Sequence, residues 1–89
     1  MSQLQGVVDD ARECARLFRL GKDVEAGLAM VVLIESAQPL VELMPGDIAS
    51  SWNMLLALML GDQQAQNWIS LADYLEYECV QLLTADQSN

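Results

Sequence analysis

The sequence contains no histidine in its 89 residues. Histidine is the commonest general base in enzymes and the commonest protein ligand of transition metals. Zinc sites take four ligands in closely spaced pairs, whereas the two cysteines, Cys14 and Cys79, lie far apart in the chain. A glycine-rich phosphate loop and a Glu-x-x-His pair are also absent. The sequence therefore predicts no metal, no cofactor and no enzymatic activity.

Long uninterrupted apolar runs are also missing. The longest candidate, residues 26–34, ends at Glu35, whereas a membrane-spanning helix needs about 20 apolar residues. The first residues do not combine a basic region with an apolar one, so no secretory signal is expected. We therefore expect a cytoplasmic protein without membrane association, in which both cysteines are reduced, buried thiols.

Basic residues are scarce, and their placement is uneven. The formal net charge is −9, and all four basic residues lie within the first 22 positions. From Asp23 onward there are ten acidic residues and no basic one. Such a surface repels nucleic acid phosphates and attracts cationic protein surfaces. We interpret it as a surface for a basic protein partner rather than for nucleic acid; the alternative is that the acidity only confers solubility.

The composition fits one folded helical domain over residues 1–89. Hydrophobic residues make up 53% of the chain and charged residues 19%, which is the opposite of a disordered sequence. Apolar residues recur at helical spacing in four segments, and no strand or hairpin pattern competes with them. We therefore predict an all-α, antiparallel four-helix bundle. A domain of this size buries its surface incompletely, so part of the apolar excess is available for an interface.

The first two helices are predicted on either side of Gly21. Residues 2–20 carry one apolar stripe at helical spacing: Leu4, Val7, Val8, Ala11, Cys14, Ala15 and Phe18. Gly21 supplies a C-terminal stop. Glu13 lies three residues before Arg16, which suits a local ion pair. The second helix starts at a capping Asp23 and is apolar nearly all round over residues 26–34, so it should be the most buried. Pro39 either ends this helix or kinks it, and the apolar residues beyond favour a kink.

The third helix is predicted to begin with Asp47 as its cap and to contain Trp52 in its apolar stripe, as a core residue rather than a contact residue. Asn67 is predicted to cap a fourth helix over residues 68–83. Its core candidates lie at helical spacing: Leu71, Ala72, Leu75, Cys79, Leu82 and Leu83. Asp73, Glu76 and Tyr77 follow spacings of three and four on the opposite side.

The fourth segment combines aromatic and acidic residues, from Trp68 to Glu78. Tyrosine and tryptophan are favoured at the centres of protein interfaces, and carboxylates pair with arginine there. We predict partner contacts at Asp73, Glu76 and Tyr77. Glu35, Glu42 and Asp47 mark a second candidate surface. The alternative is that Trp68 and Tyr74 border the core and that the acidic residues are merely solvated.

The segment from Trp68 to Glu78, with the tryptophan-containing helix before it, resembles small α-helical immunity proteins of bacterial contact-dependent growth inhibition and related polymorphic toxin systems. Size, acidity and the four predicted helices also resemble the architecture of colicin D immunity proteins. The resemblance covers about the last 40 residues of the chain. It implies a cytoplasmic protein that binds and neutralises a cognate toxin domain, often a basic nuclease, by occupying its nucleic-acid-binding or active-site surface.

Two other functions also fit the sequence. One is an acidic helical chaperone or adaptor, which would hold an extended or partly folded secreted or flagellar protein rather than a folded basic enzyme. The other is a subunit of a homo-oligomer with no foreign partner. The resemblance does not transfer individual contact residues, because inhibitor contacts vary between cognate pairs.

Overall fold

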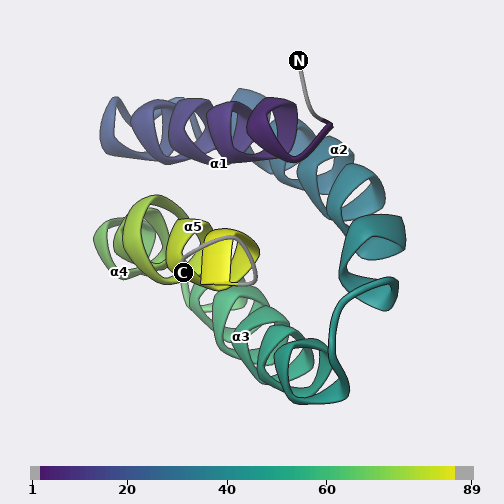
Figure 1. Cartoon of the computed structure of the whole chain (residues 1–89). Coiled ribbons are helices and arrows are strands. Elements are labelled where there is room, and N and C mark those ends of the chain that lie inside the picture. The colour runs from purple at the N-terminus through teal and green to yellow at the C-terminus, as the bar shows by residue number, and fades with distance from the viewer. Residues whose placement is uncertain (1–2, 86–89) are drawn as a thin grey trace.

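A computed structural model describes residues 3–85, which form helices joined by short turns (Figure 1). The elements are α1 (Gln3–Arg19), α2 (Asp23–Glu42), α3 (Gly46–Gln64), α4 (Trp68–Asp73), η1 (Tyr74–Glu78) and α5 (Cys79–Thr84). The last three follow one another without a break and are called the C-terminal helix, residues 68–84. Residues 3–85 contain no strand, and the predicted all-α four-helix bundle is confirmed.

The bundle is organised around α1. This helix packs against α2 on one side and against all three parts of the C-terminal helix on the other (Figure 1). α3 packs against the C-terminal helix and meets α2 near their connecting turn. The predicted apolar stripe of α1 is the reason for its central place, because every one of its members is buried: Leu4, Val7, Val8, Ala11, Cys14, Ala15 and Phe18.

Large aromatic side chains fill the space between the helices. Trp52 of α3 is fully buried, as predicted, and its indole N–H donates a hydrogen bond of 3.0 Å to the side-chain oxygen of Gln38 in α2. Phe18 of α1 stacks on Trp68 at the start of α4, with ring centroids 5.4 Å apart. Trp68 and Tyr74 are half-buried, so both border the core. The first contact joins the consecutive helices α2 and α3, and the second joins α1 to α4, which are distant in sequence.

The two cysteines behave as small core residues. Both are buried free thiols, as predicted. The Cys14 thiol donates a hydrogen bond of 3.4 Å to the backbone carbonyl of Ala26, which joins α1 to α2. Burial raises the pKa of each thiol to about 12, with smaller contributions from Glu13 at Cys14 and from Cys14 at Cys79. Both side chains are therefore thiols rather than thiolates at neutral pH.

The helix ends agree with the sequence only in part. Gly21 ends α1 with a φ of +76°, a left-handed conformation that glycine adopts without strain. The three predicted caps do not form side-chain capping bonds. Asp23 and Asp47 lie inside the first turns of α2 and α3, where their negative charges interact favourably with the helix dipole instead. Asn67 does stand at the cap position of α4, without a side-chain bond to it.

The second helix differs most from its prediction. It continues through Pro39 to Glu42, as the favoured interpretation required. It is not the most buried helix, because only the side facing the bundle is covered and Val24, Leu28 and Val32 are exposed. By length and composition α2 is also the one helix within residues 3–85 apolar enough to cross a membrane, although core helices pass the same test. Uninterrupted apolar runs did not reveal this property of α2, because Glu25 and Glu35 interrupt its apolar residues.

A π-helical turn interrupts the C-terminal helix. The N–H group of Cys79 donates to the carbonyl oxygen of Tyr74, five residues earlier, where an α-helix would use the residue four earlier. The turn spans Tyr74–Glu78, within the predicted acidic and aromatic segment. Single π turns accommodate one extra residue and are frequent at functional sites. Leu71, Leu75 and Cys79 still reach the core, whereas the predicted core residue Leu82 is only half-buried.

Candidate partner-binding surfaces

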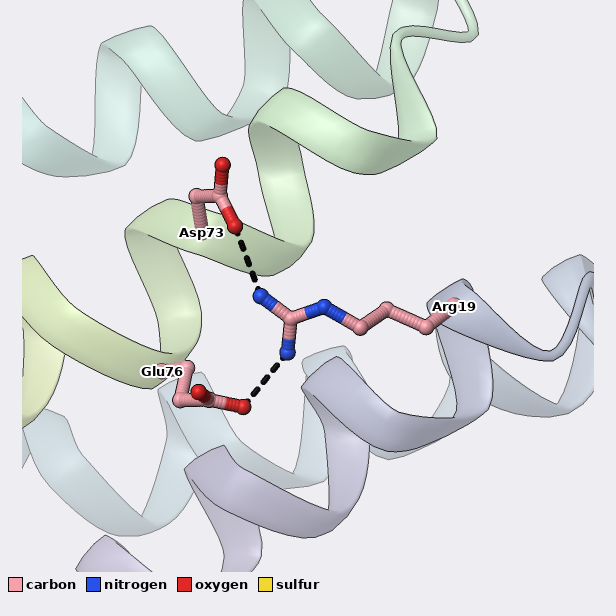
Figure 2. Close-up of polar contacts among 3 residues, drawn as sticks. All are labelled: Arg19, Asp73 and Glu76. Atoms are coloured by element: carbon pink, nitrogen blue, oxygen red, sulfur yellow. Dashed lines mark hydrogen bonds and ion pairs between the residues drawn. The ribbon is translucent and has the colours of Figure 1, made fainter.

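The first candidate surface lies where α1 meets the C-terminal helix. Asp73 of α4 and Glu76 of η1 do lie together, as their spacing predicts, but both already bind a cation of this chain. Figure 2 shows the Arg19 guanidinium reaching from the end of α1 to both carboxylates. Its Nη2 lies 2.6 Å from Oδ1 of Asp73, and its Nη1 lies 2.5 Å from Oε1 of Glu76. Arg19 therefore uses its two terminal nitrogens on two different turns of the C-terminal helix.

The electrostatics of this surface follow from that bridge. The Tyr77 hydroxyl and the Arg19 guanidinium hold the pKa of Glu76 below its ordinary value. Hydrogen bonding to Asp73 and Glu76 raises the pKa of Arg19, against the effect of partial burial. Tyr77 itself is exposed, and its interaction with Glu76 raises the pKa of its hydroxyl. Asp73, Glu76 and Tyr77 thus form one local network with Arg19.

A shallow hollow lies beside this network, between α3 and the C-terminal helix. Its volume is about 440 Å³, and Met54 and Leu58 of α3 face Tyr74 and Glu78 across it. A second hollow of about 420 Å³ shares Tyr74 and Glu78 with the first and extends to Ile69. Glu78 forms no ion pair within residues 3–85. An apolar hollow bordered by a free carboxylate suits an apolar side chain next to a cation.

The second candidate surface is the side of α2 that faces away from the bundle. The residues buried against the bundle recur at helical spacing: Ala26, Met30, Leu33, Ala37 and Val41. The opposite side carries four exposed apolar residues: Val24, Leu28, Val31 and Val32. Glu25, Glu35 and Glu42 are also exposed, and the helical spacing places them on this same side. We call these seven residues the α2 outer face.

The predicted contact residues Glu35 and Glu42 therefore belong to one continuous surface. Asp47 does not share it, because it lies in the first turn of α3 beyond the α2–α3 connection, where it is exposed. Glu42 accepts only a long hydrogen bond of 3.4 Å from Gln38 of its own helix. None of these three carboxylates forms an ion pair in the described part of the chain. The α2 outer face thus mixes apolar side chains with uncompensated negative charge.

Charge compensation across the described residues is incomplete. Glu13 pairs with Arg16 at 2.6 Å, as predicted, and Asp73 and Glu76 pair with Arg19. The other carboxylates between residues 3 and 85 have no Lys or Arg within ion-pair distance. No group of three or more acidic, cysteine or histidine side chains in this part of the chain is arranged to hold a metal ion. The surface is therefore a field of unpaired negative charge that a cationic protein surface would complement.

Two features of these surfaces were not predicted from the sequence. The Arg19 bridge joins residues more than fifty positions apart, and the signal for it was present only as a basic residue in the last turn of α1. The α2 outer face was not predicted, because a helix that is apolar nearly all round was interpreted as a buried helix. The three glutamates on one side of that helix were the signal for an exposed face.

The chain matches no protein-family model, no curated protein and no solved structure.

Proposed function

We propose that this protein is an immunity protein, which binds a basic toxin domain and neutralises it by covering the surface that the toxin uses for nucleic acid. The observation that carries the proposal is the set of carboxylates that have no ion pair within residues 3–85. A nuclease binds phosphates through lysine and arginine side chains. Carboxylates held on a helical scaffold compete for those cations and repel the phosphates from the same site.

Three further observations support the proposal. Within residues 3–85, the acidic residues after Lys22 have only Arg19 as an ion-pair partner, so most of that charge is available to another molecule. Exposed apolar side chains lie next to the carboxylates on α2 and on the C-terminal helix. Steered encounter by charge followed by apolar burial gives rapid and durable association. Such binding suits an inhibitor that must act before the toxin damages the cell.

A neutralisation assay tests the proposal directly. The proposal predicts that the gene directly upstream encodes a large exported protein, and the C-terminal domain of that protein is the partner to use. Cells that make this domain alone should stop growing, and co-expression of this chain should restore growth. An unrelated acidic helical protein of similar size and net charge is the control and should not restore growth. Continued toxicity with abundant, folded chain present would contradict the proposal.

The electrostatic part has its own measurement. The association rate of the purified chain with the domain should fall steeply between about 0.05 and 0.5 M salt, while the dissociation rate changes less. A rate that is flat over this range would mean that apolar contact alone drives binding.

The exposed apolar side chains also favour the second candidate function, a chaperone or adaptor for an unfolded export substrate. The two functions differ in the state of the partner. An immunity protein should bind the folded toxin domain and leave its thermal melt intact or raised, because a ligand of the native state stabilises that state. A chaperone should bind the denatured domain in preference and delay its refolding.

A further inference from the structure

We infer that the α2 outer face is the docking surface for the basic partner, and that it takes a cationic amphipathic segment of that partner. This inference deepens the proposed function and rests on it for the identity of the partner. It assigns the contact to α2 rather than to the Asp73 and Glu76 carboxylates, which Arg19 already occupies.

The apolar side chains of the α2 outer face are unusually exposed. Leu28 is 67% exposed and Val32 55%, although they lie one turn apart in the middle of a helix. Val24 lies one turn before Leu28 and Val31 lies next to Val32, and both are also exposed, so the four residues form one stripe. Only 28% of the most apolar 18-residue stretch of α2 is buried, whereas the core helix of a soluble protein is mostly buried. Contiguous exposed apolar surface on a small protein marks an interaction site.

The charge on this face identifies the occupant. Glu25 stands at the N-terminal end of the apolar stripe, Glu35 directly beyond its C-terminal end, and Glu42 two turns further along the helix. None of the three has an ion pair within the described residues. A second copy of this chain would bring the same uncompensated carboxylates against its own, which like-charge repulsion opposes. An anionic lipid surface is repelled for the same reason. A helix or loop with apolar residues flanked by Lys or Arg satisfies both the apolar stripe and the glutamates.

The chain offers a matched control for the apolar side chains. Met54 and Leu58 of α3 are also one turn apart, and their exposures of 70% and 52% nearly equal those of Leu28 and Val32. Glutamine is similar in size to these residues and removes their apolar character; its helix propensity matches that of leucine and methionine and exceeds that of valine. The two double variants, Leu28→Gln with Val32→Gln and Met54→Gln with Leu58→Gln, should fold alike, because all four positions are exposed.

The first test uses a synthetic helical peptide with leucines on one side and lysines flanking them. The wild-type chain should bind this peptide but not its counterpart with glutamate in place of lysine. The Leu28 and Val32 variant should bind about tenfold more weakly, and the Met54 and Leu58 variant within about twofold of wild type. Equal losses in the two variants, or a loss only in the α3 variant, would overturn the assignment. Thermal melts of both variants confirm that loss of binding is not loss of folding.

The second test addresses the carboxylates at constant net charge. Glu35→Gln with Glu42→Gln is compared with Asp9→Asn with Glu78→Gln, which removes two carboxylates from other surfaces. The first pair should weaken peptide binding more than the second, and the difference should shrink as salt is raised. Equal weakening would show that only the total charge matters and would overturn the role of this face.

The other occupants are outcomes of the same experiments. Concentration-dependent dimerisation that the Leu28 and Val32 variant abolishes would mean that a second copy covers the face. Binding to phosphatidylcholine vesicles, lost in the same variant and accompanied by no peptide binding, would mean that a membrane covers it. Either result would overturn the inference.

The neutralisation assay separates this inference from the proposed function. If wild type and the Leu28 and Val32 variant both neutralise the toxin domain equally, the α2 assignment is wrong while the proposed function stands. If wild type fails to neutralise but the peptide tests give the expected losses, the proposed function is wrong while the surface assignment stands.

Discussion

Arg19 and Glu76 are 57 residues apart in the sequence, yet the guanidinium nitrogen and the carboxylate oxygen lie 2.5 Å apart across the interface of α1 with the C-terminal helix. The second terminal nitrogen of the same guanidinium donates a hydrogen bond of 2.6 Å to the carboxylate of Asp73. The side chain of Arg19 is 32% exposed, whereas that of Arg16 is 59% exposed, so the Arg19 side chain is better shielded from water. The last turn of α1 is thereby fastened to two turns of the helix beside it.

The first prediction concerns the stability that this bridge supplies. Arg19→Ala should lower the free energy of unfolding by about 1 kcal/mol, because two partly shielded charge pairs are lost together. Arg16→Ala is the control, since Arg16 pairs only with Glu13 one turn away on the same exposed helix surface. Denaturant titration of both variants gives the comparison. An equal loss in the two variants would show that the bridge adds nothing beyond a local surface pair.

The second prediction concerns the pH dependence of the same bridge. The pKa of Glu76 in the folded protein lies below its ordinary value of 4.5, because of Tyr77 and Arg19. A lowered folded pKa means that the stabilising contribution is complete above about pH 4.5 and is lost as the pH falls through the folded pKa. Glu76→Gln should therefore be less stable than wild type at pH 7, and the difference should shrink as the pH falls below about 4.5.

The control for that measurement is Glu35→Gln, which removes an exposed carboxylate without an ion pair. It should show no loss of stability at pH 7, because repulsion within a chain of net charge −9 is relieved rather than increased. A stability difference between wild type and Glu76→Gln that stays constant from pH 7 to pH 3 would contradict the assigned role of the carboxylate.

The third prediction concerns the core. Trp52→Ala should cost about 3–5 kcal/mol, because it leaves a large cavity and also leaves Gln38 without its indole donor. Met54→Ala, two residues along the same helix, should stay within about 0.5 kcal/mol because Met54 points outward. Thermal melts followed by circular dichroism compare them without depending on tryptophan fluorescence. Similar melts for the two variants would contradict the orientation of α3.

The fourth prediction concerns the thiols. A thiol reagent at pH 8 should label neither Cys14 nor Cys79 while the protein is folded, because burial raises both pKa values to about 12 and blocks access. Both should react at once in denaturant. Ser36→Cys, which places a thiol at an exposed position of α2, is the positive control and should react in the folded protein. Rapid labelling of Cys14 or Cys79 in native buffer would show that the core opens.

The sequence predicted the helices well because helical periodicity is a local property. The apolar stripe of α1 was predicted residue by residue, since its polar side leaves a single direction for burial. α2 has no such contrast between 26 and 34, so only the packing of the other helices decides which of its sides is covered. The caps failed for a related reason. An aspartate near a helix start stabilises it either as a cap or inside the first turn, and the sequence does not distinguish the two.

The candidate site was predicted to a similar extent. The spacing of Asp73, Glu76 and Tyr77 correctly placed them together, because they are close in sequence. Their partner was not predicted, because Arg19 arrives from a helix more than fifty residues away and its position depends on how α1 packs. Glu35 and Glu42 were named as a surface, but the apolar residues around them were assigned to the core.

The last prediction uses Arg19 to decide between the two surfaces. Arg19→Ala releases Asp73 and Glu76 for an external cation, whereas Arg16→Ala changes the net charge equally and releases only Glu13. If the C-terminal helix contacted the basic partner, Arg19→Ala would bind it at least fivefold more tightly than Arg16→Ala, because two additional carboxylates would meet the cations. We expect instead equal affinities within about twofold, since the α2 outer face makes the contact. Asp73→Ala with Glu76→Ala should correspondingly lower stability, by leaving Arg19 unpaired, without weakening binding. Isothermal titration with the toxin domain, beside a thermal melt of each variant, measures both quantities, and tighter binding by Arg19→Ala would move the docking surface to the C-terminal helix.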